Sequence, residues 1–167
     1  MKLLCTSLML VAALLALPGC AKKEITPLQR KQATQLVSEA QFAATLRDFA
    51  RAEGLLAQAV ELCPDEGDTW VNLGSARLRL NQRDGAKAAY KSALEAFKAA
   101  AKKDKTDPAP ALQQVYVLAL LGQIDDARAL LEKLPARYEG NREVKAFIEE
   151  KRLDEILANP RFKQSAL

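Results

Sequence analysis

The sequence predicts an all-α fold in which antiparallel helix pairs stack into a short solenoid. The first observation is the segment 67–98, where large and small side chains have the spacing that lets two helices interlock: Trp70, Leu73, Gly74, Ala86, Tyr90 and Ala93. The second is a related pattern over 33–66, one 34-residue period earlier. One such pair cannot bury its own apolar face, so the pattern predicts stacked neighbours and a surface that presents a ligand, rather than an active site.

The central segment, 67–100, resembles a tetratricopeptide repeat (TPR). It matches that family's pattern at Trp70, Asn72, Leu73, Gly74, Ala76, Ala86, Tyr90, Ala93, Leu94 and Glu95. It departs from the pattern at Arg77, where an aromatic residue is usual, and at Lys98, where a proline usually closes the repeat. The resemblance implies a short right-handed TPR solenoid that binds other proteins, and it says little about the ligand.

Two further repeats are expected, at 33–66 and 108–139. In the first, small residues such as Ala40 and Ala52 let helices approach closely, and Pro64 ends the second helix. The third is displaced by seven residues, and we expect the surplus over 98–107 to lengthen the preceding helix and then form a basic loop.

Both ends of the predicted domain, 27–167, carry helix signals outside the repeats. Thr26 followed by Pro27 begins a helix well before the first repeat, which predicts an N-terminal helix extension. Asn141 begins a capping helix over about 142–157, with apolar residues including Val144 and Leu153 expected on one face. The tail, 158–167, contains NPRF and resembles a closing segment of bacterial TPR proteins that folds back onto the last helices.

Residues 1–19 have the features of a signal peptide: Lys2 followed by an uncharged Leu- and Ala-rich run over 3–17. The LPGC ending resembles a bacterial lipobox, with Pro18 as a departure from the usual residue. This resemblance implies lipid on Cys20, a tether over 20–26, and a location in the cell envelope. Because Ala21 follows the cysteine, that location would be the periplasmic face of the outer membrane in a Gram-negative cell. The alternative is a plain signal anchor with an incidental cysteine.

Composition argues against catalysis. The 167 residues include no histidine, which excludes Ser–His–Asp and Cys–His machinery and His-ligated zinc. The glycines stand in no phosphate-loop context, and Cys63 is alone once Cys5 and Cys20 are accounted for. We therefore expect no enzyme, no cofactor, no metal site and no small-molecule substrate.

Net charge is only +4, and aromatic residues are few, which argues against nucleic-acid binding. The one dense basic cluster comprises Lys98, Lys102, Lys103 and Lys105. A solvated helix end explains it, because cations complement the helix dipole there. Contact with anionic lipid headgroups is the alternative.

The first helix of each repeat lines the concave face in TPR proteins, and the family's contact positions can be carried onto this sequence. They give a candidate partner-binding groove formed by Gln41, Thr45, Asp68, Asn72, Ser75, Arg79, Gln113 and Tyr116. Asn72 occupies a position that family members often use to hydrogen-bond a peptide backbone, and its amide has both donor and acceptor. It is also a common residue of the pattern, so both interpretations stay open.

The sequence thus favours a membrane-anchored adaptor in the bacterial cell envelope that binds a peptide or helix of a protein partner in its concave groove. The alternative is a constitutive structural subunit of an envelope assembly or secretion complex. Such a subunit would dock through its convex face or terminal helices, and its own Phe162 segment would fill the groove.

Overall fold

A computed structural model describes residues 24–167, so the predicted signal peptide and Cys20 lie outside the described residues. The described part is all-helical. Its elements are α1 (Pro27–Thr45), α2 (Phe49–Leu62), α3 (Gly67–Arg79), α4 (Arg83–Lys103), α5 (Ala109–Leu120), α6 (Ile124–Arg137), α7 (Arg142–Glu149), α8 (Arg152–Ala158) and α9 (Pro160–Lys163). The predicted all-α solenoid is confirmed.

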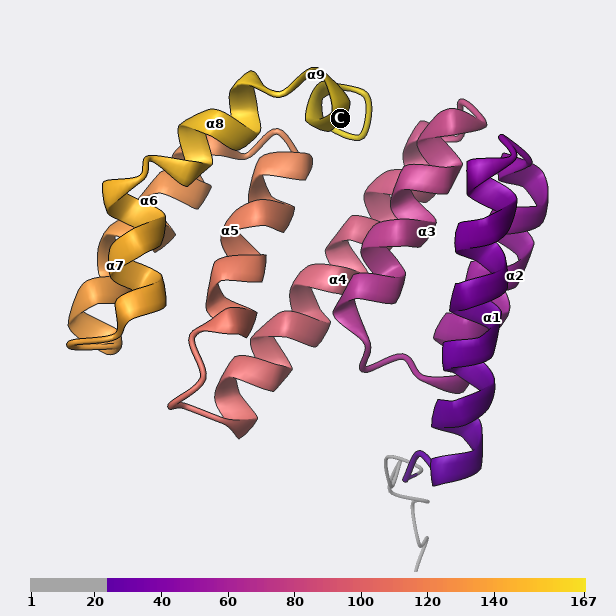
Figure 1. Ribbon diagram of the computed structural model, residues 1–167, viewed down its shortest axis with the longest axis horizontal. Coiled ribbons are helices and arrows are strands. Elements are labelled where there is room, and N and C mark those ends of the chain that lie inside the picture. Colours follow the sequence, from indigo (N-terminus) through magenta and orange to yellow (C-terminus); the bar gives the residue numbers. More distant parts are fainter. Residues whose placement is uncertain (1–23) are drawn as a thin grey trace, which may run out of the picture.

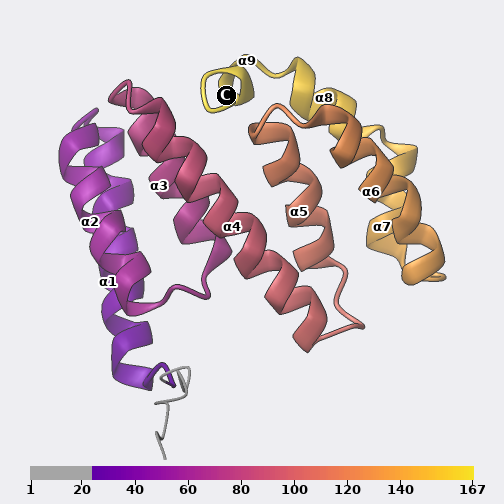
Figure 2. The same ribbon diagram turned by 180° about the vertical axis from the view of Figure 1, so that it is seen from behind.

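The helices pack in neighbouring pairs along a curved stack. Each of α1 to α5 packs against the helix that follows it in the chain. Figures 1 and 2 show α1, α3 and α5 on one face of the stack and α2, α4 and α6 on the other. The contact positions predicted from the family pattern therefore share one face.

The turns within the three helix pairs, α1–α2, α3–α4 and α5–α6, share one backbone conformation. Arg47, Asn81 and Gly122 follow α1, α3 and α5, and each has a positive φ, of 62°, 60° and 72°. A left-handed residue just beyond a helix end turns the chain back and satisfies the last carbonyls. Arg47 and Asn81 are 34 positions apart, whereas Asn81 and Gly122 are 41 apart.

The seven surplus residues lie in α4. This helix has 21 residues, against 14 in α2 and 14 in α6. The added turns stay attached to the stack, since Ala101 is buried and its carbonyl accepts a hydrogen bond from Arg137 at 3.0 Å. α4 ends at Lys103, so the expected lengthening of the preceding helix is confirmed. The loop that follows, 104–108, has one lysine and two aspartates, so the expectation of a basic loop was wrong.

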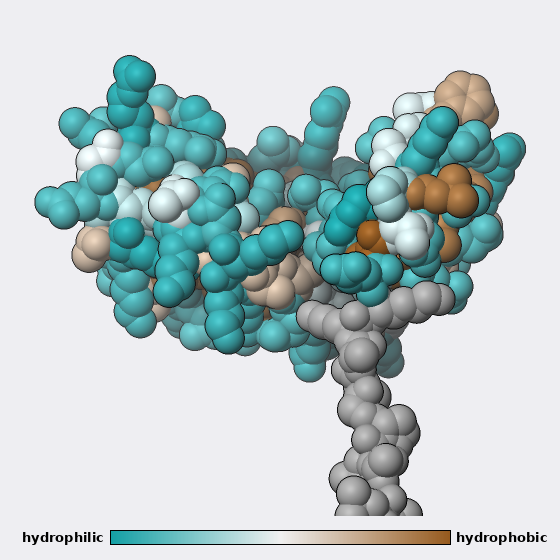
Figure 3. All heavy atoms as spheres, turned by 90° about the horizontal axis from the view of Figure 1, so that it is seen from below, coloured by the Kyte–Doolittle hydropathy of each residue, from teal (hydrophilic) through white to brown (hydrophobic). Residues whose placement is uncertain are grey.

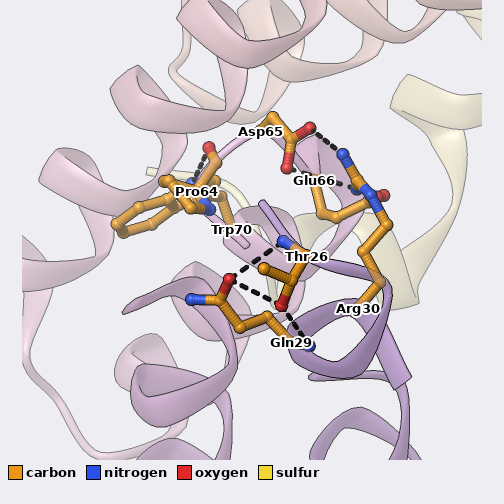
Figure 4. Close-up of polar contacts among 7 residues, drawn as sticks. All are labelled: Thr26, Gln29, Arg30, Pro64, Asp65, Glu66 and Trp70. Carbon is orange, nitrogen blue, oxygen red and sulfur yellow. Dashed lines mark hydrogen bonds and ion pairs between the residues drawn. The ribbon is translucent and has the colours of Figure 1, made fainter. Parts of the chain in front are cut away.

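Polar contacts join the first two helix pairs (Figure 4). Thr26 and Gln29 form a capping box that begins α1. One turn later, Arg30 pairs with Asp65 at 2.7 Å and with Glu66 at 2.8 Å, in the loop between α2 and α3. Trp70 donates its indole N–H to the Pro64 carbonyl at 2.9 Å. The exposed ion pairs contribute little singly, but with the indole bond they tie the loop between α2 and α3 to the start of α1 and to Trp70.

The capping helix differs from its prediction. The chain breaks after α7, where Lys151 has φ 49°, and α8 then turns back so that Asp154 pairs with Arg128 of α6 at 2.7 Å. Val144 and Leu153 are both buried. They are nine residues apart, so on one straight helix they would point in opposite directions. The expected single face over 142–157 was wrong, and the break brings both side chains into the core.

The two helices of the central pair meet closely at a glycine. A Cβ placed on Gly74 of α3 would lie 2.3 Å from the ring of Tyr90 of α4, which is fully buried. The Tyr90 hydroxyl lies 3.3 Å from Ser75 Oγ and donates to the Ser165 carbonyl at 2.5 Å. Burial raises the pKa of Tyr90 from 10.0 to about 12.

Replacing Gly74 with alanine tests this approach. The methyl group must displace the buried Tyr90 ring, and such overpacking costs about 1–3 kcal/mol. Gly54, inside α2, is the matched control, because nothing lies within 4 Å of an added Cβ. We expect Gly74→Ala to lower the free energy of unfolding in urea, and Gly54→Ala to raise it by up to about 1 kcal/mol through helix propensity. Equal stability of the two variants would show that α3 and α4 do not meet so closely.

The pKa of Tyr90 predicts a loss of stability in alkali. The unfolded residue ionises near pH 10 and the folded one near 12, so the free energy of unfolding falls as pH rises from about 10 to 12. Tyr90→Phe lacks this ionisation and should show a shallower decline over the same interval. Urea unfolding followed by circular dichroism at pH 9, 10 and 11 measures the two slopes. Parallel slopes would mean that Tyr90 titrates equally in both states.

Candidate functional site

An open cavity of about 220 Å³ lies on the shared face, between α1, α2 and α3. Its lining residues are Ala40, Gln41, Ala44, Phe49, Ala52, Leu56, Asn72, Ser75, Ala76, Arg79 and Ser165. Four of the eight predicted groove residues are among them: Gln41, Asn72, Ser75 and Arg79. We call this space the open cavity.

The open cavity has an apolar floor and a polar rim. Ala40, Ala52 and Leu56 are buried at its base, whereas Gln41 and Arg79 are exposed at its edge. The Arg79 guanidinium lies 5.6 Å from the centroid of the Phe49 ring, which holds the cation over the apolar floor. An apolar floor with a few polar groups at the rim is typical of ligand-binding sites in general.

The other four predicted residues do not line the open cavity. Thr45 donates its hydroxyl to the Phe42 carbonyl at 2.6 Å, within its own helix. Asp68 is exposed on the first turn of α3, where neighbouring groups desolvate its carboxyl in part and raise its pKa. Gln113 and Tyr116 lie on α5, on the far side of α3 from the cavity, and both are half-buried.

The last six residues, 162–167, lie between the C-terminal ends of α3 and α5, and we call them the C-terminal hexapeptide. Figure 1 shows the C-terminus in this position. The Phe162 ring packs edge-on against Tyr116, with centroids 5.7 Å apart. Arg79 donates to the Gln164 side chain at 2.7 Å, and the Leu167 amide donates to the Leu120 carbonyl at 2.9 Å.

The hexapeptide divides the shared face into two halves. It covers the side between α3 and α5, where burial raises the pKa of Tyr116. Ser165 borders the open cavity, which continues toward α1. Figure 3 shows the molecule from below as a largely hydrophilic surface, hollowed between its two ends, with apolar residues gathered at the end formed by α1 and α2.

Gln164 and Ser165 were not among the predicted groove residues. The NPRF motif predicted that the tail folds back onto the last helices, and Phe162 is indeed buried. The alternative in which the Phe162 segment fills the groove anticipated the general position of these residues. Their individual contacts had no sequence signal, because they depend on the break at Lys151 and on a main-chain carbonyl that accepts from Tyr90.

The remaining polar features have local structural explanations. Cys63 is buried at the end of α2, and burial raises the pKa of its thiol. Lys98 pairs with Glu95 at 2.8 Å, and Lys102 and Lys103 lie in the last turn of α4, where they complement the helix dipole.

Over residues 24–167, no three His, Cys, Asp or Glu side chains lie together as metal ligands would. Within the same residues, none of the helices has the length and apolar character needed to cross a membrane.

Comparison with known proteins identifies the repeats. Residues 67–99 match one family model and residues 86–150 match a second, and both models are described as Tetratricopeptide repeat. Comparison with curated proteins and with solved structures gave no match. The matched residues run from α3 into α7, and the helix pair formed by α1 and α2 precedes them in the same stack. The chain is a tetratricopeptide repeat protein, of a family whose members are typically non-catalytic modules for protein–protein interaction.

Proposed function

We propose that this protein is a membrane-anchored adaptor of the bacterial cell envelope that holds a peptide or helix of a protein partner in the open cavity. Tetratricopeptide repeats are interaction modules, which supplies the general class. The observation that carries the finer proposal is the open cavity, an unfilled space on the face where the family binds its ligands.

Two side chains of α3 give the open cavity its binding chemistry. Asn72 is half-buried in the wall, and its amide can both donate to and accept from an extended main chain. Arg79 presents a planar fork of donors at the rim, which suits a carboxylate or a carbonyl of the partner. The apolar floor below them accommodates one side chain of the bound segment.

The proposed anchor is lipid on Cys20. That cysteine ends the LPGC sequence and precedes Pro27, the first residue of α1, by seven positions. Two or three acyl chains hold a protein firmly on a bilayer, whereas a single chain binds only reversibly. A tether of this length keeps the repeats, and any bound partner, close to the lipid surface.

One observation favours a second candidate, a constitutive subunit that docks through its terminal helices. On α1 and at its end, Leu28, Phe42 and Leu46 are 64%, 65% and 65% exposed. Phe42 and Leu46 are neighbours at the C-terminal end of α1, whereas Leu28 lies at the other end of the helix. An exposed apolar patch such as the one at the C-terminal end marks an interaction surface in soluble domains. Phe42→Glu with Leu46→Glu would release a partner bound there and leave a partner in the open cavity in place.

The adaptor proposal predicts the effect of changing the cavity wall. Asn72→Ala with Arg79→Glu removes the amide and reverses the rim charge, and it should lose a specific partner in crosslinking and affinity purification from cells. The matched control is Gln58→Ala with Lys87→Glu, exposed residues of α2 and α4 that do not line the cavity. Recovery of the same partner with wild type and both variants would contradict binding in the cavity.

The anchor predicts how the protein partitions in cells. Wild type should remain with membranes in high salt and dissolve in detergent, whereas Cys20→Ser should lose its lipid mass and move to the soluble fraction. Cys63→Ala is the control, because Cys63 is buried in the fold. The Cys63→Ala protein should remain with the membranes as the wild type does. Continued membrane retention of Cys20→Ser would favour a plain signal anchor.

A further inference from the structure

The C-terminal hexapeptide makes the contacts that a bound peptide makes. Two are main-chain contacts, from the Tyr90 hydroxyl to the Ser165 carbonyl and from the Leu167 amide to the Leu120 carbonyl. Two are side-chain contacts, of Phe162 with Tyr116 and of Gln164 with Arg79. Main-chain bonds are independent of the residue type, so the aromatic anchor and the acceptor two positions later carry the sequence preference.

The hydrogen bond that the Gln164 side chain accepts is weaker than the one a charged acceptor would form at the same place. Arg79 donates to the neutral amide oxygen of Gln164, and no ion pair to Arg79 occurs within residues 24–167. A carboxylate in place of that amide forms a charge-assisted bond to the guanidinium, which is about twice as strong as a neutral one. A segment with Asp or Glu at that point therefore fits the Arg79 side of the face better than the chain's own residues do.

We propose that the C-terminal hexapeptide is a tethered occupant that a partner displaces, and that the displacing segment carries an aromatic residue followed two positions later by Asp or Glu. The inference rests on the proposed function and deepens it, because it names the partner's chemistry. The partner enters through the open cavity, which Ser165 and Arg79 both border, and then replaces Phe162 against Tyr116.

Because the hexapeptide is part of the same chain, a partner segment must compete with it for the face between α3 and α5. An occupant joined to the fold by a short segment of the same chain competes at an effective concentration on the order of millimolar. Only a segment with stronger contacts than the hexapeptide then binds at the lower concentrations of a cell. The hexapeptide thus excludes weak ligands, and the exchange at Arg79 selects for an acidic one.

Two fluorescent peptides test the proposal by anisotropy with the purified full chain. One has the sequence of residues 158–167, and the other is identical except for Gln164→Glu. We expect the acidic peptide to bind about tenfold more tightly, which corresponds to about 1.4 kcal/mol. Arg79→Gln in the protein should abolish the difference between the two peptides. Equal binding of both peptides to the wild-type protein would overturn the acidic preference.

Two protein variants test the competition. Phe162→Ala loosens the hexapeptide and should raise the affinity for the added acidic peptide at least tenfold. Gln164→Glu in the chain tightens it and should lower that affinity several-fold. If Phe162→Ala fails to fold, as judged by circular dichroism, the Gln164→Glu protein decides alone. Unchanged affinity in either folded variant would overturn the role of the hexapeptide as a tethered occupant. A dimer that becomes a monomer when the peptide is added would also overturn it, because the hexapeptide would then fill the groove of a second copy.

Failure of this inference is distinguishable from failure of the proposed function. A cellular partner that depends on Asn72 but is captured equally by wild type and Phe162→Ala would preserve the adaptor and refute displacement. The expected peptide results without any partner that depends on Asn72 would preserve displacement and refute the adaptor.

Discussion

The close contact of Gly74 with Tyr90 determines how the two helices of the central pair pack. Because Gly74 has no side chain, the Tyr90 ring can lie against α3 and become fully buried. That position places the hydroxyl next to Ser75 and within reach of the Ser165 carbonyl. One residue therefore joins the core of the central helix pair to the C-terminal hexapeptide on the shared face.

Departures from the repeat pattern are compensated by polar bonds across helix boundaries. Arg77, where the pattern has an aromatic residue, donates to Glu53 of α2 at 3.0 Å and to the Gly85 carbonyl of α4 at 3.3 Å. Gln114 is buried in α5 and donates to the Phe97 carbonyl at 3.3 Å. Both side chains connect neighbouring helix pairs, so the polar residues replace apolar packing without leaving buried groups unpaired.

The sequence was sufficient for the helix pairs and insufficient for the C-terminal region. Gly74, Tyr90 and the 34-residue period follow from local spacing, and the same spacing located the surplus residues in α4. The break at Lys151 lets Val144 and Leu153, which a straight helix would place on opposite sides, both reach the core, and no local pattern marks its position. Gln41, Asn72, Ser75 and Arg79 could be placed by family position, whereas the hexapeptide reaches α3 through tertiary contacts that no local pattern encodes.

The proposed binding of a protein partner in the open cavity between α1 and α3 can be tested in living cells. A photo-crosslinking amino acid at position 72, compared in living cells with the same amino acid at positions 42 and 87, tests it most directly. We expect a specific crosslinked protein from position 72 and none from position 87, on the outer side of α4. Crosslinks from position 42 alone would contradict it, and would place the partner on the exposed apolar residues of α1.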